Sequence, residues 1–411
     1  MSSVSSSSSR RSSWGESPER DWSPGPSSSS TSVDDTQSEI VRWIIDTRNI
    51  WHGNSIQDAA GEYLNYISEG ERKAITRKYH IADAKMSLAS ALLKRAFIAR
   101  VTGLLWHDIE FTRKGHPVHG KPAWDPPKFN TTGVPWPNVD FNVSHQAGLV
   151  TLVGVCVPDG ELLPHEEALV GCDIVAPHER SDLEMIQTSD FEDYTSTFDQ
   201  IFSDSELWDI TYNLPSHAVQ LYNGQRLSEQ ELGRLDRVIN TDQNCSVTMP
   251  DGRVESFPSD LIIDAKLRRF YTFFTLKESY IKLCGEGLLA PWLKELEFRN
   301  VSAPTPGTQA RCSTSGTWGG KTHGGRPSVD YMTGGFSFAN GQEEDVEIWR
   351  DGEEVHGVRT EVQSFEEDFM ISAMISPPHL VGSRDGFPPW ENCDMERDIL
   401  FVARMGKLML S

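Results

Sequence analysis

The sequence predicts a protein that contains both strands and helices, preceded by a tail without fixed structure. Short apolar runs recur along the chain, and two longer stretches have apolar residues spaced three or four positions apart. Runs of the first kind are typical of strands, and the second spacing is typical of helices. The tail is predicted because 16 of the first 32 residues are serine. Such a segment cannot bury enough apolar area to offset its ordering entropy.

The elements follow the tail in order, starting near Ile40. Apolar runs predict strands over 41–47, 109–111, 139–142, 149–157 and 169–175. Helical spacing predicts helices over 75–101 and 261–284, with a possible new helix start near Asp83. Two polar stretches rich in turn formers, 213–258 and 302–342, are expected to be surface loops or disordered.

Length and composition limit the classes of protein that are possible. The 411 residues allow two or three globular units at about 150 residues each. The net charge of −22 argues against a general nucleic-acid binder, which needs a basic face. A large share of that charge lies in 343–368, which holds 11 acidic and 2 basic residues and has no predicted role.

The sequence also predicts where the protein lies in the cell and the state of its cysteines. The longest apolar run, 149–157, is too short for a membrane span of about 20 residues. The tail has no apolar core of a secretory signal, and its Glu16, Glu19 and Asp21 disfavour a transit peptide. Six cysteines include no Cys-x-x-Cys pair, so we expect reduced thiols in a cytoplasmic protein.

Polar residues at one predicted strand end form the first candidate site. The segment Phe141-Asn142-Val143-Ser144-His145-Gln146 places several hydrogen-bonding side chains within a few residues. Such a cluster suits a phosphate or a ribose. Taken alone, a polar turn that caps the next element is the more common explanation.

The second candidate is an acid within an apolar strand, Asp173 in Val170-Gly171-Cys172-Asp173-Ile174-Val175. A carboxylate there is costly unless it is paired, protonated or bound to a cation. A magnesium ion held by this acid and by substrate phosphates would compensate the charge. Hydrogen bonds from backbone N–H groups at a strand end are an equally good explanation.

The third candidate lies on the second predicted helix, where Glu278 and Lys282 are four residues apart on one face. An ordinary ion pair is the common meaning of this spacing. The surrounding helix is unusually apolar and aromatic, however, so part of that face is expected to be covered. A covered Glu beside a metal could act as a general base, and a covered Lys could bind phosphate.

The three segments in this order resemble a known family far more specifically than any one of them. N-V-S-H-Q, then V-G-C-D-I, then L-K-E-S-Y-I-K-x-x-G-x-G-L is closely similar to the Sfp-type 4′-phosphopantetheinyl transferases. The resemblance extends to Gly120-Lys121-Pro122, to 79–85, to 289–298 and to a strand over 368–374. The insertions and the serine-rich tail resemble the fungal branch of that family.

The resemblance implies an α+β fold of two similar subdomains related by a pseudo-twofold axis, with the coenzyme between them. We place these subdomains at 38–165 and 166–405, after a disordered tail over 1–37. The insertions near 213–258 and 302–342 fall in the second subdomain.

It also implies an activity and its partners. These enzymes move 4′-phosphopantetheine from coenzyme A to a carrier-protein serine, with Mg²⁺, and release adenosine 3′,5′-bisphosphate. Acyl carrier, peptidyl carrier and aminoadipate-reductase-type carrier domains are the expected partners of a cytoplasmic monomer that binds neither nucleic acid nor membrane. Alternatives are a catalytically weak or inactive carrier-binding homologue, and a generic Mg²⁺-dependent phosphohydrolase.

Residue by residue, the resemblance implies that Asp173 and Glu278 bind Mg²⁺, with Glu278 also accepting the serine proton and Lys282 stabilising phosphoryl charge. Bacterial members often carry a second acid where this chain has Val175. We therefore expect Gln146 or water to complete the metal site, and Val175→Glu to be tolerated. The implied coenzyme-binding residues are Arg113, Lys121, Asn142, Ser144, His145 and Lys282, together with Arg72, Lys73 and Lys85 near the start of the first predicted helix.

Overall fold

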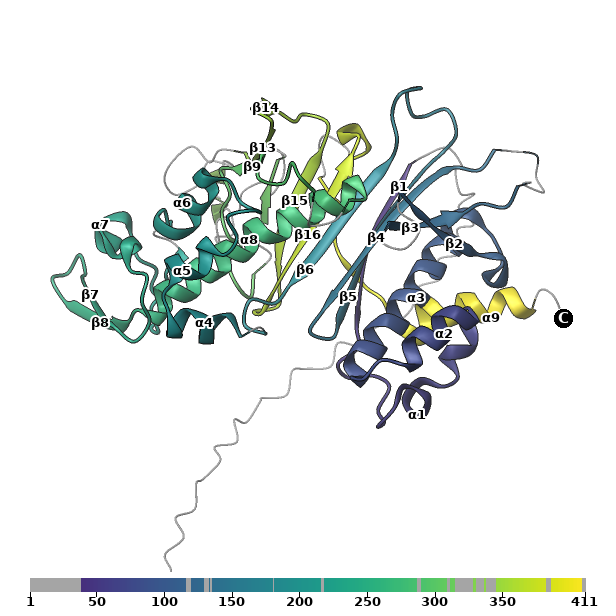
Figure 1. Cartoon of the computed structure of the whole chain (residues 1–411), viewed down its shortest axis with the longest axis horizontal. Helices are drawn as coiled ribbons and strands as arrows, with labels where there is room; N and C mark the ends of the chain where they lie inside the picture. Colours follow the sequence, from purple (N-terminus) through teal and green to yellow (C-terminus); the bar gives the residue numbers. More distant parts are fainter. Residues whose placement is uncertain are drawn as a thin grey trace, which may run out of the picture. The chain divides into compact units, whose positions relative to one another are not determined.

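The computed structural model describes residues 38–115, 120–128, 133, 135–179, 181–215, 218–286, 290–308, 311–314, 328–329, 336–337, 345–381 and 386–408. Within the chain, Thr36–Ser411 form one compact unit. The predicted tail over 1–37, and most of the predicted loop over 302–342, lie outside the described residues. The described part contains both helices and strands, so the predicted mixed class is confirmed (Figure 1).

The first sheet has the strand order β17-β1-β5-β4, and the long helix α3 packs against it (Figure 1). Its members are β1 (Glu39–Asp46), β4 (Asn138–Gln146), β5 (Leu149–Val157), β17 (Glu391–Asn392) and α3 (Ile81–Thr102). Every residue of β5 is buried, because Leu152 faces the core under α3 while Val153 faces the second half of the molecule. Strands covered on both faces are expected to be apolar throughout.

Shorter elements surround this sheet. They are α1 (Ile56–Ala60), η1 (Tyr63–Tyr66), α2 (Glu69–Thr76), η2 (Trp106–Asp108), β2 (Glu110–Lys114) and β3 (Lys121–Asp125). The helical stretch predicted over 75–101 is divided, since α2 ends at Thr76 and α3 begins at Ile81. A new helix start near Asp83 was therefore a correct expectation.

The second sheet has the order β10-β15-β16-β6, and α8 lies against it (Figure 1). Its members are β6 (Leu169–Val175), β10 (Arg311–Ser313), β15 (Arg359–Phe365), β16 (Phe369–Ser376) and α8 (Asp260–Cys284). The surrounding elements are α4 (Asp182–Thr188), α5 (Phe191–Ser196), α6 (Asp204–Tyr212), β9 (Leu296–Arg299), β13 (Glu347–Arg350), β14 (Glu353–Glu354) and η5 (Pro378–Leu380). A further short pair is β11 (Ser328–Val329) with β12 (Phe336–Ser337).

The two sheets meet along their edge strands, β4 and β6. These two strands belong to different sheets, and side chains on one face of β4 accept hydrogen bonds from the backbone of β6. The Val170 N–H donates to Asp140 Oδ2 at 2.8 Å, and the Cys172 N–H donates to Asn142 Oδ1 at 3.1 Å. Two backbone N–H groups at the edge of β6 are thereby hydrogen-bonded to β4, so the edge of β6 is covered at this point.

Two predictions of chain organisation need correction. The stretch 213–258 is not an unstructured loop, because it contains α7 (Glu229–Leu232), η4 (Leu235–Arg237) and the hairpin of β7 (Asn244–Thr248) and β8 (Val254–Pro258). These elements bury an apolar cluster of their own against the start of α8, including Leu221, Val247 and Phe257. Strand β7 alternates polar and apolar residues, and β8 buries chiefly Phe257, so few residues of the stretch are apolar in sequence.

The end of the chain also differs from expectation. The second subdomain was expected to continue to residue 405, yet η6 (Met395–Leu400) and α9 (Phe401–Leu408) pack in the core of the first sheet. Met395, Leu400 and Ala403 contribute to that core.

The described residues include no helix that is both long and apolar enough to cross a membrane.

Candidate active site

A cluster of one lysine, two carboxylates and a serine lies where β4, β6 and α8 come together. The Lys282 Nζ is 2.6 Å from Asp173 Oδ1 and 3.1 Å from Ser144 Oγ. Ser144 Oγ donates to the same Asp173 oxygen at 2.8 Å. Glu278 lies one turn before Lys282, with its Oε2 4.0 Å from the ammonium. The structure therefore brings together Asp173, Glu278 and Lys282, the three predicted catalytic residues.

A glycine allows α8 to approach β6 this closely. A Cβ atom at Gly171 would lie 2.0 Å from the Ser279 carbonyl oxygen and 2.7 Å from the Leu283 nitrogen. Real Cβ atoms do not approach backbone atoms to such distances, so the helix would have to move. Gly171 therefore brings the last turn of α8, with Lys282, within hydrogen-bonding distance of Asp173.

The electrostatics of the cluster favour a charged lysine. Burial acts to lower the pKa of Lys282, but the carboxylates of Asp173 and Glu278 outweigh it and raise that pKa. The side chains of Lys282, Asp173 and Glu278 retain 26%, 8% and 14% of their solvent exposure. The cluster is thus partly accessible, and its ammonium is available to stabilise an anionic ligand.

His145 and Gln146 end β4 close to this cluster. Strand alternation places His145 on the opposite face of β4 from Ser144. Desolvation by the surrounding protein lowers the pKa of His145, and the nearby charges of Lys282 and Lys78 lower it further. Gln146 shares the strand face of Ser144 and is half-buried. Lys78 was missed by the sequence analysis, which considered other basic residues of the same segment.

Two of the predicted coenzyme-binding residues, Lys121 and Asn142, take part in the contacts between β4 and β6. The Lys121 ammonium is buried, pairs with the Asp140 carboxylate and donates to the Val170 carbonyl oxygen at 2.6 Å. Asn142 accepts from β6, as described above. The expected direct contact of Lys121 with coenzyme A disagrees with this burial. The sequence analysis did not single out Asp140. Its spacing of two residues from Asn142, which is itself two residues before Ser144, places all three on one face of the strand and could have identified it.

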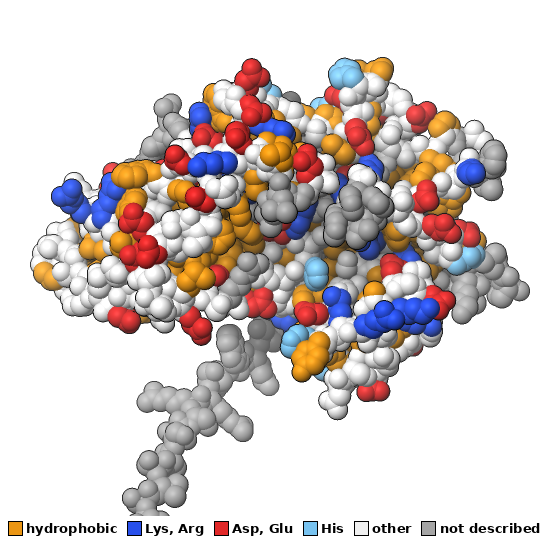
Figure 2. Space-filling model, viewed as in Figure 1, with side chains coloured by type: hydrophobic (Ala, Val, Ile, Leu, Met, Phe, Trp, Pro, Cys, Tyr) orange, Lys and Arg blue, Asp and Glu red, His pale blue; other side chains and the backbone are white. Residues whose placement is uncertain are grey.

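The remaining predicted coenzyme-binding residues lie on other elements. Arg113 on β2 is exposed and donates to the Gly120 carbonyl at 2.6 Å. Lys85 on α3 donates to the Ile50 carbonyl at 2.7 Å. Lys73 on α2 is 63% exposed and pairs with Glu69 at 2.5 Å. Figure 2 shows a band of Lys and Arg side chains over the region of α2 and α9. Among the described residues, these three side chains pair with partners outside the Lys282 cluster.

Val175 does not lie where a second acid could be accommodated. It shares a strand face with Asp173, but it is 1% exposed and packs among Ile186, Phe270 and Tyr271. This burial argues against the expectation that Val175→Glu would be tolerated. An unpaired carboxylate in this apolar cluster would lose its hydration without a compensating partner.

The oxygen donors of the cluster fit a magnesium ion. Mg²⁺ prefers oxygen ligands, keeps several waters and is commonly bound through one or two carboxylates plus substrate phosphates. Asp173 and Glu278 supply two carboxylates, at 2.6 and 4.0 Å from Lys282 Nζ. Among the described residues, no three His, Cys, Asp or Glu side chains form a ready-made metal cage. Such a set suits an ion that arrives with a phosphate substrate.

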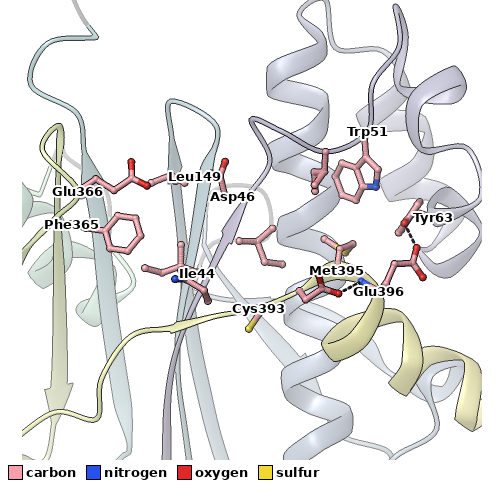
Figure 3. A pocket seen from close by; sticks show the side chains of 14 residues that line it. Ile44, Asp46, Trp51, Tyr63, Leu149, Phe365, Glu366, Cys393, Met395 and Glu396 are labelled. Carbon is pink, nitrogen blue, oxygen red and sulfur yellow. Dashed lines mark hydrogen bonds between the residues drawn. The ribbon is translucent and has the colours of Figure 1, made fainter. Parts of the chain in front are cut away.

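A cavity of about 470 Å³ lies elsewhere, beside the end of β1. Figure 3 shows Trp51 and Tyr63 on one side of it and Phe365 and Glu366 on the other. The Tyr63 hydroxyl donates to Glu396 (Figure 3). None of the predicted site residues lines this cavity, and the chemistry described above is concentrated at β4, β6 and α8.

Comparison with known proteins agrees with this site. A family model described as "4'-phosphopantetheinyl transferase, N-terminal" matches residues 54–157. The chain is 45% identical over 365 residues to a 4'-phosphopantetheinyl transferase of Aureobasidium melanogenum, covering 89% of this chain and 97% of that protein. It is 33% identical over 289 residues to 4'-phosphopantetheinyl transferase NpgA of Emericella nidulans, covering 67% and 70%.

A third relative, 4'-phosphopantetheinyl transferase A of Aspergillus fumigatus, is 30% identical over 355 residues, covering 81% of this chain and 82% of that protein. These alignments include both halves of the fold, and the relatives named here are fungal. The resemblance found in the motifs is confirmed: the chain belongs to the fungal 4′-phosphopantetheinyl transferases.

Proposed function

We propose that this enzyme transfers 4′-phosphopantetheine from coenzyme A to a serine hydroxyl of a carrier domain, in a Mg²⁺-dependent reaction. The serine oxygen forms a bond to the β-phosphorus of coenzyme A. The bond from that phosphorus to the bridging oxygen breaks, and adenosine 3′,5′-bisphosphate leaves. The observation that carries the proposal is the cluster of Asp173, Glu278 and Lys282 at the junction of β6 and α8.

The residues of the cluster have separate roles in this proposal. Glu278 accepts the proton of the attacking serine, a role that suits a carboxylate with 14% solvent exposure. Lys282, kept charged by its two carboxylate neighbours, stabilises negative charge on the pyrophosphate oxygens. Asp173, Glu278 and Gln146 would hold the magnesium ion, which when bound neutralises phosphate charge.

The coenzyme would lie along the exposed end of β4. His145 is the expected partner of the ribose 3′-phosphate, because it is solvent-accessible and lies near Lys282 and Lys78. Arg113 remains a candidate phosphate contact on an exposed strand. Lys121 is left out of the coenzyme site, since its ammonium is buried against Asp140.

The proposal also covers the subdomains, the active form and the carrier domains. We infer that they are the pseudo-twofold-related subdomains, divided within 158–168, and that a cytoplasmic monomer is the active form. A relative in Schizosaccharomyces pombe, named L-aminoadipate-semialdehyde dehydrogenase-phosphopantetheinyl transferase, is 31% identical over 122 residues, covering 29% of this chain and 42% of that protein. That name supports aminoadipate-reductase-type carriers beside acyl and peptidyl carrier domains.

Intact-mass measurement tests the proposal directly. The full chain is incubated with coenzyme A, Mg²⁺ and a panel of apo-carrier domains, and each carrier is weighed before and after. We expect a covalent phosphopantetheine adduct, together with free adenosine 3′,5′-bisphosphate. An unmodified carrier with bound enzyme would identify an inactive carrier-binding homologue, and free phosphopantetheine would identify a phosphohydrolase.

A further inference from the structure

The cavity beside the end of β1 has a floor of apolar and aromatic side chains. Ile44, Leu149 and Met395 line it and are 1%, 0% and 6% exposed. Trp51 and Tyr63 are also buried, and their ring centroids lie 5.1 Å apart. The volume of about 470 Å³ falls within the range of small-molecule sites, about 300–1,000 Å³. A floor of this kind can cover the apolar body of a ligand.

The rim of the same cavity carries four carboxylates from three separate segments. Asp46 ends β1, Glu366 lies in the turn between β15 and β16, and Asp394 and Glu396 lie at the start of η6. The side chains of Asp46, Glu366 and Glu396 retain 39%, 45% and 52% of their solvent exposure. No Lys, Arg or His is among the described residues that line the cavity. The rim is therefore acidic and open to solvent, above an apolar floor.

Two arginines outside the cavity neutralise part of this charge. Arg48 Nη2 lies 2.8 Å from Asp46 Oδ2 and 2.9 Å from Glu366 Oε1. Arg404 Nη1 lies 3.1 Å from Glu396 Oε2. In the described part of the chain, these are the ion pairs of the rim, so four carboxylates face two guanidinium groups. The rim keeps an excess of negative charge, which favours a cation over an anion.

The walls of the cavity are held in place by contacts of their own. Trp51 has a φ of 56°, which a bulky side chain rarely adopts, so the surrounding packing holds it there. The Tyr63 hydroxyl donates to Glu396 and ties the aromatic wall to the acidic rim (Figure 3). Walls that are already ordered lower the entropic cost of binding. The faces of Trp and Tyr rings also attract cations.

We propose that this cavity binds a small organic cation, in which an ammonium group is joined to an apolar body. The body would lie against Trp51, Tyr63 and Ile44, and the ammonium would lie among the carboxylates of the rim. The site is separate from the proposed active site, because β5 lies between β1 and β4 in the sheet. The inference therefore does not depend on the proposed function.

Three probes with similar apolar bodies test the charge preference. They are phenethylammonium, phenethyl alcohol and phenylpropanoate, which are cationic, neutral and anionic. Calorimetry measures the binding of each probe to the full chain at neutral pH and low salt. We expect phenethylammonium to bind at least about tenfold more tightly than the alcohol, and phenylpropanoate to bind more weakly than either, because the rim and the aromatic faces both favour a cation.

The double variant Glu366→Gln/Glu396→Gln locates the bound probe, since it removes two rim charges and keeps the side-chain shapes. The Kd of phenethylammonium should rise by about fivefold or more, because each exposed charge contact contributes a few-fold. Glu367→Gln/Glu391→Gln is the matched control: both acids are exposed, lie close in sequence to rim residues and do not line the cavity. The control should stay within about twofold of wild type, well below the effect of losing two charge contacts.

Two further measurements complete the test. Ile50→Trp places a larger side chain on the cavity wall and should abolish binding, so it replaces the double variant if melting curves show that the latter is unfolded. Saturating coenzyme A should leave the Kd of phenethylammonium unchanged, because the active-site residues Asp173, Glu278 and Lys282 do not line the cavity.

Several results would overturn the inference. Equal binding of the ammonium and the alcohol would contradict the preference for a cation, and so would the absence of binding by any probe. An equal rise in Kd in the rim variant and its control would place the probe on another acidic surface. Displacement by coenzyme A would place it in the active site. None of these results depends on whether a carrier domain is modified, so the proposed function is tested separately.

Discussion

Two adjacent residues of α8, Lys277 and Glu278, point to different environments. The Lys277 ammonium is fully buried, 2.7 Å from Glu206 Oε2 and 3.1 Å from the Leu293 carbonyl oxygen. Glu278 is partly exposed beside Lys282. Consecutive side chains on a helix are separated by about 100°. The same motif can therefore direct Lys277 into the protein interior and Glu278 toward the active site. Lys277 fixes the helix against its surroundings while Glu278 remains accessible to substrate.

Glu278→Gln should lower turnover by at least about 100-fold, because the amide keeps the shape of the side chain but cannot accept a proton. Turnover is measured from the mass of modified carrier over time. Glu295→Gln is the control, since Glu295 is an exposed acid shortly after α8. A Glu278→Gln enzyme that retains more than a tenth of wild-type turnover would contradict the general-base role.

Val175→Glu should destabilise the fold by several kcal/mol, since it buries an unpaired charge or forces protonation of the new side chain. Chemical denaturation of Val175→Glu and Val175→Leu, measured side by side, checks this expectation. Leucine should cost much less, because it remains apolar. A Glu variant as stable as wild type would mean that this part of β6 opens to solvent or to a cation.

At the scale of elements, the site depends on how closely α8 and β6 pack. The helix ends at Cys284 and is followed by Gly285, which has the left-handed φ of 74°. Gly171 lets the preceding turn of this helix lie against the strand. The glycine of V-G-C-D-I and the lysine of the helix motif thus belong to one packing arrangement.

Gly171→Ala should therefore reduce activity and stability together. The new methyl group would lie 2.0 Å from the Ser279 carbonyl oxygen, so α8 must shift and lengthen the Lys282–Asp173 contact. Overpacking of this kind typically costs about 1–3 kcal/mol. Gly70→Ala on α2 is the matched control, because no atom lies within 4 Å of its added Cβ. Equal stability of the two variants would disprove close packing at Gly171.

The folded stretch 213–258 is attached to α8 by a buried lysine. Lys266 donates to the carbonyl oxygens of Thr211 and Val238 at 2.6 and 2.7 Å. Burial lowers the pKa of Lys266 from 10.5 to about 8. Between these two values the unfolded chain binds more protons than the folded one, so stability should rise with pH from about 8 to about 10.5.

Melting temperatures of wild type and Lys266→Met across this pH range test the expectation. The wild type should gain stability relative to the variant as pH rises, because deprotonation removes the cost of burying the ammonium. Parallel curves for the two proteins would show that Lys266 keeps an ordinary pKa in the folded state.

How much of this arrangement can be predicted from sequence depends on the kind of signal. Strand β5 and helix α8 were predictable, since their long apolar patterns are local. The roles of Lys121 and Val175 were not, because motif position identifies a residue but not its burial. The hairpin of β7 and β8 was missed because its strands are short and exposed on one face.

At the scale of the whole described unit, the two halves are also joined away from the active site. Arg42 on β1 and Glu361 on β15 form an ion pair at 2.6 Å, with 1% and 4% side-chain exposure. Arg42 also lies over the rings of Phe387 and Trp390. The pair lies on strands of different sheets, so it connects them independently of β4 and β6.

Arg42→Met should destabilise the protein by about 3–5 kcal/mol, because it removes the 2.6 Å partner of the buried Glu361 carboxylate, whose contact to Arg311 is longer at 3.4 Å. Urea denaturation provides the measurement. Lys73→Met, which removes an exposed ion pair with Glu69, should change stability by less than about 1 kcal/mol. Similar values for the two variants would mean that the Arg42 pair has ready access to water.

The return of the chain end to the first core has a consequence for synthesis on the ribosome. Met395, Leu400 and Ala403 fill the same core as α3 and β5, and β17 adds to the edge of β1. A nascent chain therefore carries an uncovered apolar surface from its first half until residues 391–403 are translated. Domains usually fold in order as they emerge. Here the first half cannot complete its core before residues 391–403 emerge, so removal of this segment leaves the first half unfinished as well.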